Sequence, residues 1–394
     1  MPSLSYWESQ TFIGQPDLVI VGAGFVGLRT ALSIREQERI HALEPSDILV
    51  VDRHAFGLGA STRNAGFACF GSPTEILADL ENGRPEAVWQ TVMRRYKGVQ
   101  RLRQELSETP YWQGQGGYEV FLDKDKYEYV RDNLSELNRE LSERLGPDAQ
   151  WLPTDKPTGL QSDYPVLYNR AEAKLQPAAL LKNLQEQCQR QGIRFLFGCR
   201  VCSFVEVNGR VQLETEQMGS IVCQRILLAT NAFSRELGLN LDLRPQRNLV
   251  LLTAPIPDLD LPGTYHHHEG YVYFRTVNSQ AGSRVLIGGA RHLDEAAETT
   301  DFEADHSTGT TAGIEELVKS LENYLFAFLR TRESNIQITH TWMGILAQGT
   351  EKTPIVKSLR PGVFVAARLA GMGVALSAEV GDQAAKLLLV DMRS

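Results

Sequence analysis

The chain has 394 residues, of which 42% are hydrophobic, and this length is enough for two or three domain-sized cores. Its 40 basic and 48 acidic side chains leave a formal net charge of −8, which disfavours nucleic acid or anionic lipid as the main partner. No run of about 18 apolar residues occurs, so we expect no membrane span. The start, MPSLSYWESQTF, lacks the basic and apolar regions of a signal peptide, which indicates a cytoplasmic protein.

The first 52 residues predict one strand–helix–strand unit. Residues 18–21 form a short, fully apolar and mostly β-branched run that is typical of a buried parallel strand. A helix is expected from Val26 to about Gln37, and a second buried strand is expected at residues 47–52, DILVVD.

The middle of the chain alternates between helical and strand patterns. Apolar residues recur at helical spacing over residues 88–106 and 130–145, and we interpret both helices as packing elements of a second domain. Residues 151–168 are rich in Pro, Gly and Asp and are expected to form a connection. A helix at 180–191, strands at 194–197, 199–207, 211–215 and 221–229, and a hairpin turn at Asn208-Gly209 follow.

Residues 243–289 predict short alternating strands, and the acidic stretch 294–307 predicts an exposed loop. The chain closes with a strand at 363–367, a glycine turn and a helix at 377–389. Helix and strand thus alternate at both ends around an insert, which predicts an α/β dinucleotide-binding domain with an inserted α+β domain. We place the first domain at residues 1–85, 165–240 and 340–394 and the second at 86–164 and 241–339.

Gly22, Gly24 and Gly27 form G-x-G-x-x-G between the first strand and the first helix. Gly22 allows a tight turn, Gly24 lets the backbone approach a pyrophosphate, and Gly27 lets the helix lie close to the sheet. The free N–H groups and partial positive charge of the helix N-terminus favour phosphate at this position. The motif therefore predicts a dinucleotide cofactor.

Two further features bear on which dinucleotide binds. Asp52, which lies 25 residues beyond Gly27, suits a carboxylate that accepts hydrogen bonds from ribose hydroxyls, although a strand-end Asp in a solvated turn is the alternative. Residues 57–66, GLGASTRNAG, are small and polar, so Ser61 and Arg63 could reach phosphate oxygens while the backbone lies near a flavin ring. A loop without a ligand could have the same composition.

Five cysteines form an odd, scattered set, which is typical of a reduced protein. Cys199 and Cys202 form C-x-x-C, but they fall in a predicted strand without further ligands nearby, so we interpret them as structural.

The ordered set GAGFVG, VVDRHAFGLGASTRNAG, LQPAALLKNLQEQCQRQGIRFLFGCRVCSFVE, LLATNAF, YVYFRTVNSQ, VLIGGARH and VFVAARLAGMGVALSAEVGDQAAKLL resembles the D-amino acid oxidase and glycine oxidase (DAO) family of FAD-dependent oxidoreductases. The resemblance covers nearly the whole chain. It implies a glutathione-reductase-like FAD domain of Rossmann type and a substrate domain whose antiparallel sheet covers the flavin.

The resemblance also implies the positions of the cofactor contacts. Val201 would contact the adenine through its backbone, and residues 371–374 would border the pyrimidine end of the flavin from the start of the last helix. No cysteine follows Cys223, so we expect non-covalent FAD. The complete expected cofactor set is Gly22, Ala23, Gly24, Phe25, Val26, Gly27, Asp52, Arg53, Gly59, Ala60, Ser61, Arg63, Asn64, Ala65, Gly66, Val201, Thr230, Gly371, Met372, Gly373 and Val374.

The implied reaction is oxidation of the C–N bond of an amino acid or amine, with hydride transfer to flavin N5 and hydrolysis of the resulting imine, which needs no side-chain base. Family members that oxidise amino acids hold the carboxylate with arginines. The matching positions here are Leu346 and Gly371. Arg275 is the best remaining candidate for binding a substrate carboxylate, followed by Arg291 and Arg368. Because the family's two carboxylate-binding arginines are missing, the amine-oxidising gamma-glutamylputrescine oxidoreductase branch is also a possible match.

Aromatic residues and histidines supply further candidates. Tyr271, Tyr273 and Trp342 could line a substrate cavity, although core packing is an alternative for all three. His266, His267 and His268 cannot all face one metal on a strand, because neighbouring side chains point to opposite faces. We therefore expect no metal, and we expect one of these histidines, taken as His268, near the substrate.

Three other functions remain as alternatives. An NAD-dependent dehydrogenase would share the glycine motif but has no need for residues 57–66. A non-catalytic flavin-binding protein would bind FAD without turnover. A role in tRNA modification is disfavoured by the acidic charge.

Overall fold

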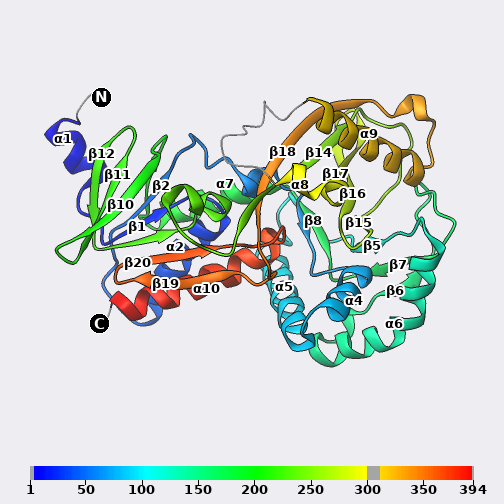
Figure 1. Ribbon diagram of the computed structural model, residues 1–394, viewed down its shortest axis with the longest axis horizontal. Helices are drawn as coiled ribbons and strands as arrows, with labels where there is room; N and C mark the ends of the chain where they lie inside the picture. Colours follow the sequence, from blue (N-terminus) through cyan, green and yellow to red (C-terminus); the bar gives the residue numbers. More distant parts are fainter. Residues whose placement is uncertain (1–3, 300–310, 393–394) are drawn as a thin grey trace. The chain divides into compact units, whose positions relative to one another are not determined.

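The computed structural model describes residues 4–299 and 311–392 (Figure 1). The chain forms two compact units. Unit 1 comprises Met1–Arg63, Pro177–Gln246 and Ile345–Ser394, and unit 2 comprises Asn64–Gln176 and Arg247–Gly344. The first break falls after Arg63 and the second after Gln176, whereas the sequence placed the corresponding domain boundaries after residues 85 and 164. Each unit has its own sheet and is described separately.

Unit 1 is built on a six-stranded sheet with the order β19-β20-β13-β1-β2-β9. Neighbouring strands from β20 to β9 are parallel, and β19 alone pairs antiparallel, with β20. All four residues of β1 are buried because the strand lies in the middle of this sheet. The strands are β1 (Leu18–Val21), β2 (Ile48–Asp52), β9 (Arg194–Phe197), β13 (Arg225–Leu228), β19 (Ile355–Arg360) and β20 (Val363–Ala367).

Helices α2 (Phe25–Ile40) and α10 (Gly373–Met392) lie side by side in unit 1 (Figure 1). The contact is close because Gly381 of α10 has no side chain: a Cβ there would lie 2.6 Å from Cβ of Arg29 on α2. α10 begins four residues before the helix predicted at 377–389, at the end of the glycine turn. The other helical segments of unit 1 are α1 (Tyr6–Glu8), a π-helical turn (Ser9–Ile13), α3 (Ala60–Arg63), α7 (Pro177–Arg190) and a 3₁₀ turn (Asn231–Leu237).

A separate antiparallel sheet in unit 1 contains β10 (Val201–Val207), β11 (Arg210–Thr215) and β12 (Gly219–Cys223). The predicted turn at Asn208-Gly209 connects β10 and β11, with both residues at positive φ (52° and 73°). The single strand predicted at 221–229 is wrong. The chain leaves this sheet at Gln224 and enters the parallel sheet as β13, because two different sheets pair with the two halves of the apolar run.

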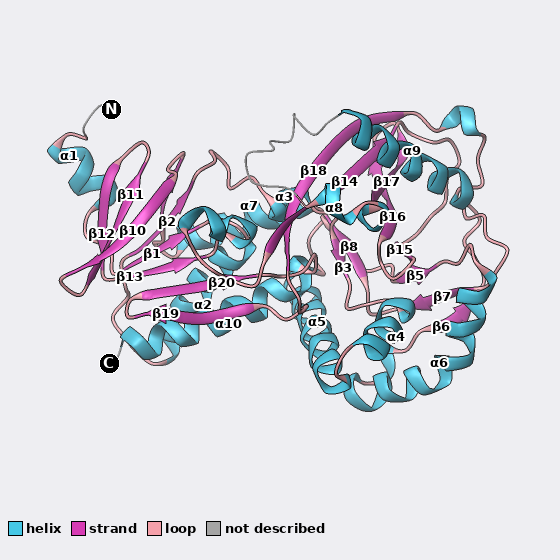
Figure 2. Cartoon of the chain, viewed as in Figure 1, coloured by secondary structure: helices cyan, strands magenta, loops and turns pink. Residues whose placement is uncertain are grey.

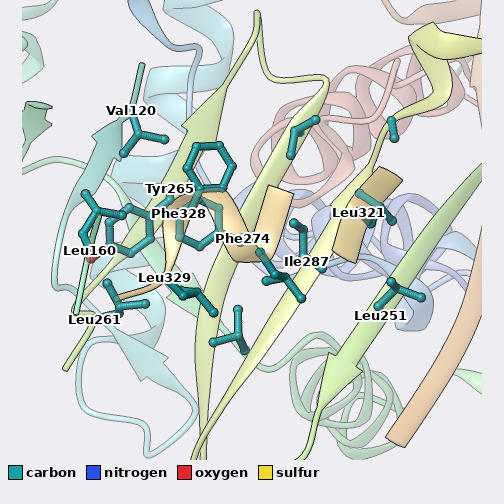
Figure 3. Packing of buried hydrophobic residues seen from close by; sticks show 14 of the residues in the cluster. Val120, Leu160, Leu251, Leu261, Tyr265, Phe274, Ile287, Leu321, Phe328 and Leu329 are labelled. Atoms are coloured by element: carbon teal, nitrogen blue, oxygen red, sulfur yellow. The ribbon is translucent and has the colours of Figure 1, made fainter. Parts of the chain in front are cut away.

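Unit 2 is built on an eight-stranded sheet with the order β18-β14-β17-β16-β15-β5-β7-β6. Its central hairpin, β16 and β17, alternates so that Phe274 faces the main core while Tyr273 packs with a smaller cluster on the other face. Figure 3 shows the main core, in which Tyr265, Phe274 and Phe328 stack face to face with ring centroids 4.6 and 4.8 Å apart. The strands are β5 (Gly117–Glu119), β6 (Leu152–Thr154), β7 (Val166–Asn169), β14 (Arg244–Thr253), β15 (Thr264–His267), β16 (Val272–Ser279), β17 (Gly282–Gly289) and β18 (Ile338–Gln348).

Residues 151–168, predicted to be a connection, contain β6 and the start of β7, so that prediction is wrong. Both are short strands that pair with each other, and β7 is held in the sheet by β5, a partner about 50 residues earlier in the chain (Gly117 opposite Asn169). The two predicted packing helices correspond to α5 (Pro85–Leu106) and α6 (Lys124–Leu145) (Figure 2). The remaining elements are a small sheet of β3 (Phe67–Ala68), β8 (Ala173–Leu175) and β4 (Trp112–Gln113), helices α4 (Pro73–Asn82), α8 (Glu295–Glu298) and α9 (Thr311–Phe328), and 3₁₀ turns at Pro147–Ala149, Arg291–Leu293 and Glu333–Asn335.

The stretch 294–307, predicted to be an exposed loop, begins with α8, and its part from 300 onward lies outside the described residues. Within the described part of the chain, no helix is both long enough and apolar enough to cross a membrane.

Candidate functional site

The glycine turn lies between β1 and α2 and is held by close backbone packing. Gly22 has φ of +112°, and a Cβ there would lie 2.6 Å from the carbonyl oxygen of Ala229. A Cβ on Gly27 would lie only 2.1 Å from the carbonyl oxygen of Gly22, so the helix reaches this position only without a side chain. The turn thus has the close backbone packing that a pyrophosphate-binding turn requires, and the N-terminus of α2 follows it directly.

Asp52 at the end of β2 fixes the same turn. Its Oδ2 accepts a hydrogen bond from the backbone N–H of Ala23 (2.8 Å), and its Oδ1 accepts one from that of His54 (2.8 Å). Burial raises the pKa of this carboxyl, and the two backbone hydrogen bonds oppose the rise. Each oxygen retains a second lone pair, so the carboxylate can still accept hydrogen bonds from ribose hydroxyls.

The segment GLGASTRNAG contributes to both units. Ser61 lies on the short helix α3, and its Oγ accepts a hydrogen bond from the backbone N–H of Phe25, the first residue of α2 (3.0 Å). The same Oγ would lie 3.0 Å from a Cβ on Gly24. Ala60, Ser61 and Arg63 belong to unit 1, whereas Asn64, Ala65 and Gly66 belong to unit 2.

The remaining predicted cofactor residues of unit 1 follow strands of the parallel sheet. Thr230 lies two residues beyond β13, Gly371 lies four residues beyond β20, and Val201 lies four residues beyond β9 as the first residue of β10. Because the carboxyl ends of parallel strands share one edge of a sheet, these residues gather at the same edge as Gly22 and Asp52. This edge is where open α/β sheets bind their ligands.

Two predicted arginines of unit 1 are engaged within the protein. Arg53, expected at the cofactor, lies over the ring of Phe233 (3.9 Å) and pairs with Glu236 at 3.4 Å. Arg368, a substrate candidate, is buried and pairs with Asp242, and its Nε donates to the carbonyl oxygen of Thr353 (2.8 Å). These contacts give the Arg368 side chain a role in holding unit 1 together.

Arg275 in unit 2, the preferred substrate candidate, is buried on β16. Its guanidinium donates to three backbone carbonyl oxygens, those of Ala65, Leu175 (3.1 Å) and Thr276 (3.4 Å). Ala65 belongs to the predicted flavin-contacting segment, so Arg275 anchors that segment to the sheet of unit 2. Burial lowers the pKa of Arg275 to about 10.

Lys174 on β8 is a second buried cation beside Arg275, and it is not among the site residues predicted from the sequence. Its Nζ donates to Oγ1 of Thr276 (2.7 Å), and burial together with the charge of Arg275 lowers its pKa to about 8. Within residues 4–299 and 311–392, neither cation has an acidic partner. Sequence reasoning could not have found the pair of Lys174 and Arg275, because β8 and β16 lie far apart in the sequence. Lys174 and its hydrogen-bond partner Thr276 are separated by 102 positions.

Tyr273 and Trp342 pack around one small apolar cluster of unit 2, formed by Ala65, Val250 and Leu286. The hydroxyl of Tyr273 accepts a hydrogen bond from the side-chain amide of Asn248. Arg291 lies over the ring of Tyr271, 5.0 Å from its centroid, and His268 lies in a turn at φ +50°, with its ring 4.7 Å from that of His292. The structure thus brings Tyr273 and Trp342 together and places His268 in a different cluster.

Comparison with known proteins identifies the class to which this arrangement belongs. Residues 17–387 match the DAO family, described as FAD dependent oxidoreductase. The chain therefore belongs to the DAO family of FAD-dependent oxidoreductases.

Individual relatives are similar over nearly the whole chain. A probable oxidoreductase OrdL of Haemophilus influenzae is 22% identical, with 97% of this chain and 84% of the relative covered. Among solved structures, glycine oxidase from Geobacillus kaustophilus has a TM-score of 0.69 at 17% identity and covers 95% of each chain. L-alpha-glycerophosphate oxidase from Mycoplasma pneumoniae, solved with FAD bound, has a TM-score of 0.72 at 15% identity and also covers 95% of each chain.

These comparisons confirm the predicted family, the fold class and FAD as the cofactor. The alternative of an NAD-dependent dehydrogenase is therefore wrong. The glycine turn and the carboxylate of Asp52 fit FAD, because they place an open backbone for the phosphates and a hydrogen-bond acceptor for the ribose at one sheet edge.

Proposed function

We propose that this FAD-dependent oxidoreductase oxidises the C–N bond of an amino acid or amine to an imine, which then hydrolyses. The observation that carries the proposal is the single sheet edge where Gly22, Asp52, Thr230 and Gly371 gather in a chain of the DAO family. Relatives named glycine oxidase and L-proline dehydrogenase suggest nitrogen-bearing substrates.

The residues of unit 1 would bind and orient the cofactor. The N-terminus of α2 would receive the phosphates, Asp52 would accept ribose hydroxyls, and the N-terminus of α10 at Gly373 would stabilise negative charge near the ring. When bound, FAD supplies the acceptor for the two electrons that leave the substrate carbon.

The residues of unit 2 support an acidic substrate. Lys174 and Arg275 are buried cations without a carboxylate partner among the described residues, and buried charge is costly without one. A substrate carboxylate would balance this charge. Lys174→Met should therefore raise KM for acidic substrates roughly tenfold or more and leave KM for uncharged amines unchanged. An equal effect on both substrate classes would contradict this role.

The main test is an anaerobic flavin-reduction screen with D-amino acids, glycine derivatives and polyamine conjugates. We expect at least one of these compounds to bleach the flavin, and bleaching would also exclude a non-catalytic flavin-binding protein. The screen also includes glycerol 3-phosphate, whose oxidation would take place at a C–O bond instead of a C–N bond. Bleaching by that compound alone would overturn the proposal.

A further inference from the structure

Three potential metal ligands from distant parts of the sequence meet inside unit 2. Sγ of Cys69, a carboxylate oxygen of Glu172 and a ring nitrogen of His266 all lie within 4.8 Å of one another. The three residues are 6%, 0% and 5% exposed, so water does not compete for these atoms. Sulfur, oxygen and imidazole nitrogen at this spacing are the ligand types that zinc takes in a tetrahedral site.

The strands of unit 2 explain why the three side chains converge. β3 and β8 are antiparallel with Ala68 opposite Ala173, and continuing this register places Cys69 opposite Glu172. His266 lies on β15, where its Nε2 is 2.7 Å from Oε2 of Glu172. Its ring stands at 75° to that of Phe67, with the centroids 5.4 Å apart, which fixes the ring's direction.

The neighbouring strand β5 makes room for the cluster. A Cβ on Gly117 of β5 would lie 2.1 Å from Oε2 of Glu172, so the carboxylate occupies space that any other residue would fill. Glu119 of the same strand is the direct register partner of His266 and is fully buried. Its side chain accepts a hydrogen bond from Oγ1 of Thr74.

We propose that Cys69, Glu172 and His266 bind a zinc ion in unit 2. The three consecutive histidines, considered as one set, predict no metal. In the structure only His266 joins this cluster, because Nδ1 of His267 bonds to the carbonyl oxygen of Val120 (3.0 Å) and His268 lies in a turn.

Burial and neighbouring charges shift the pKa values of two side chains in the cluster. Burial raises the pKa of the Cys69 thiol well above its usual range. Burial alone would lower the pKa of His266, but the carboxylates of Glu172 and Glu119 raise it above its ordinary value. Zn²⁺ would bind the thiolate form of Cys69 and the neutral ring of His266.

The test uses the full-length, FAD-loaded protein, produced without a histidine tag in zinc-supplemented medium and passed over a chelating resin. We expect inductively coupled plasma mass spectrometry to detect about one zinc per chain. Replacement by Co²⁺ should give a thiolate-to-cobalt charge-transfer band in the near ultraviolet.

Two variants and two matched controls assign the ligands. Cys69→Ser and His266→Gln should each lower zinc affinity at least tenfold, and Cys69→Ser should abolish the cobalt band. Cys202→Ser, which changes an exposed thiol, and His267→Gln, which changes the adjacent imidazole, should retain both. Wild-type protein with neither zinc nor a cobalt band would overturn the proposal, as would variants that keep their zinc. If Cys69→Ser fails to fold, the cobalt charge-transfer band is measured in the Cys202→Ser protein instead. Because Cys202 is the exposed cysteine, a band that persists in this variant must come from a buried thiolate.

Discussion

Gly27 and Gly24 belong to one motif, but their surroundings predict different consequences of substitution. In Gly27→Ala the new Cβ would meet the carbonyl oxygen of Gly22 at 2.1 Å, so the free energy of unfolding of the apoprotein should fall by about 1–3 kcal/mol. In Gly24→Ala the nearest atom is Oγ of Ser61 at 3.0 Å, on a side chain that can rotate. We expect this variant to keep apoprotein stability and to lose FAD affinity, as checked by thermal unfolding and FAD titration. Equal melting temperatures of the two apoproteins would contradict the assignment.

Lys174 makes stability depend on pH in the alkaline range. Its pKa of about 8 lies below the ordinary 10.5, so between these values the unfolded chain binds more protons than the folded protein. The free energy of unfolding should therefore rise with pH across this window, by roughly 3 kcal/mol in total. Lys174→Met should remove the rise, as measured by urea unfolding at several pH values, whereas Lys182→Met, which changes an exposed lysine, should retain it. A rise of the same size in the Lys174→Met protein would contradict this prediction.

At the scale of elements, the pair α2 and α10 depends on Gly381. Gly381→Ala would place a Cβ 2.6 Å from Cβ of Arg29 and 2.9 Å from its carbonyl carbon, which should separate the helices and cost about 1–3 kcal/mol of stability. Gly373→Ala on the same helix is the control, since its nearest neighbour, a Cδ atom of Leu369, lies 3.7 Å away. Chemical unfolding of the apoproteins should show a loss for the first variant only.

The elements also show why only part of the architecture could be predicted. The turn from β1 into α2 depends only on residues that are neighbours in the sequence, so its glycine motif predicts it. The split at Gln224 and the short strand β7 depend on partners elsewhere in the chain, and local composition does not indicate those partners. The same reason applies to the site. Gly22 and Asp52 were found from the motif, whereas Lys174, Glu172 and Cys69 become notable only once β3, β8, β15 and β16 are assembled.

At the scale of the whole molecule, FAD should act as a stabilising ligand because it is expected to bind only the folded chain. At a free concentration one hundred times its dissociation constant, a dissociable ligand adds about 2.7 kcal/mol. The melting temperature should therefore rise with FAD concentration and fall again after dialysis. Flavin that stays with the acid-precipitated protein would contradict non-covalent binding.

The order of the strands in unit 1 has a consequence for biosynthesis. The cofactor turn after β1 is made before residue 30, whereas β20 and α10 follow only at residues 363–392. A growing chain on the ribosome thus presents the cofactor turn almost at once, while the strand that flanks β13 and the helix that covers Arg29 are still missing. Because these contacts span most of the chain, folding of unit 1 can finish only after residues 363–392 have been made. A chain that stops before residue 363 lacks the strand beside β13 and should yield no smaller flavoprotein.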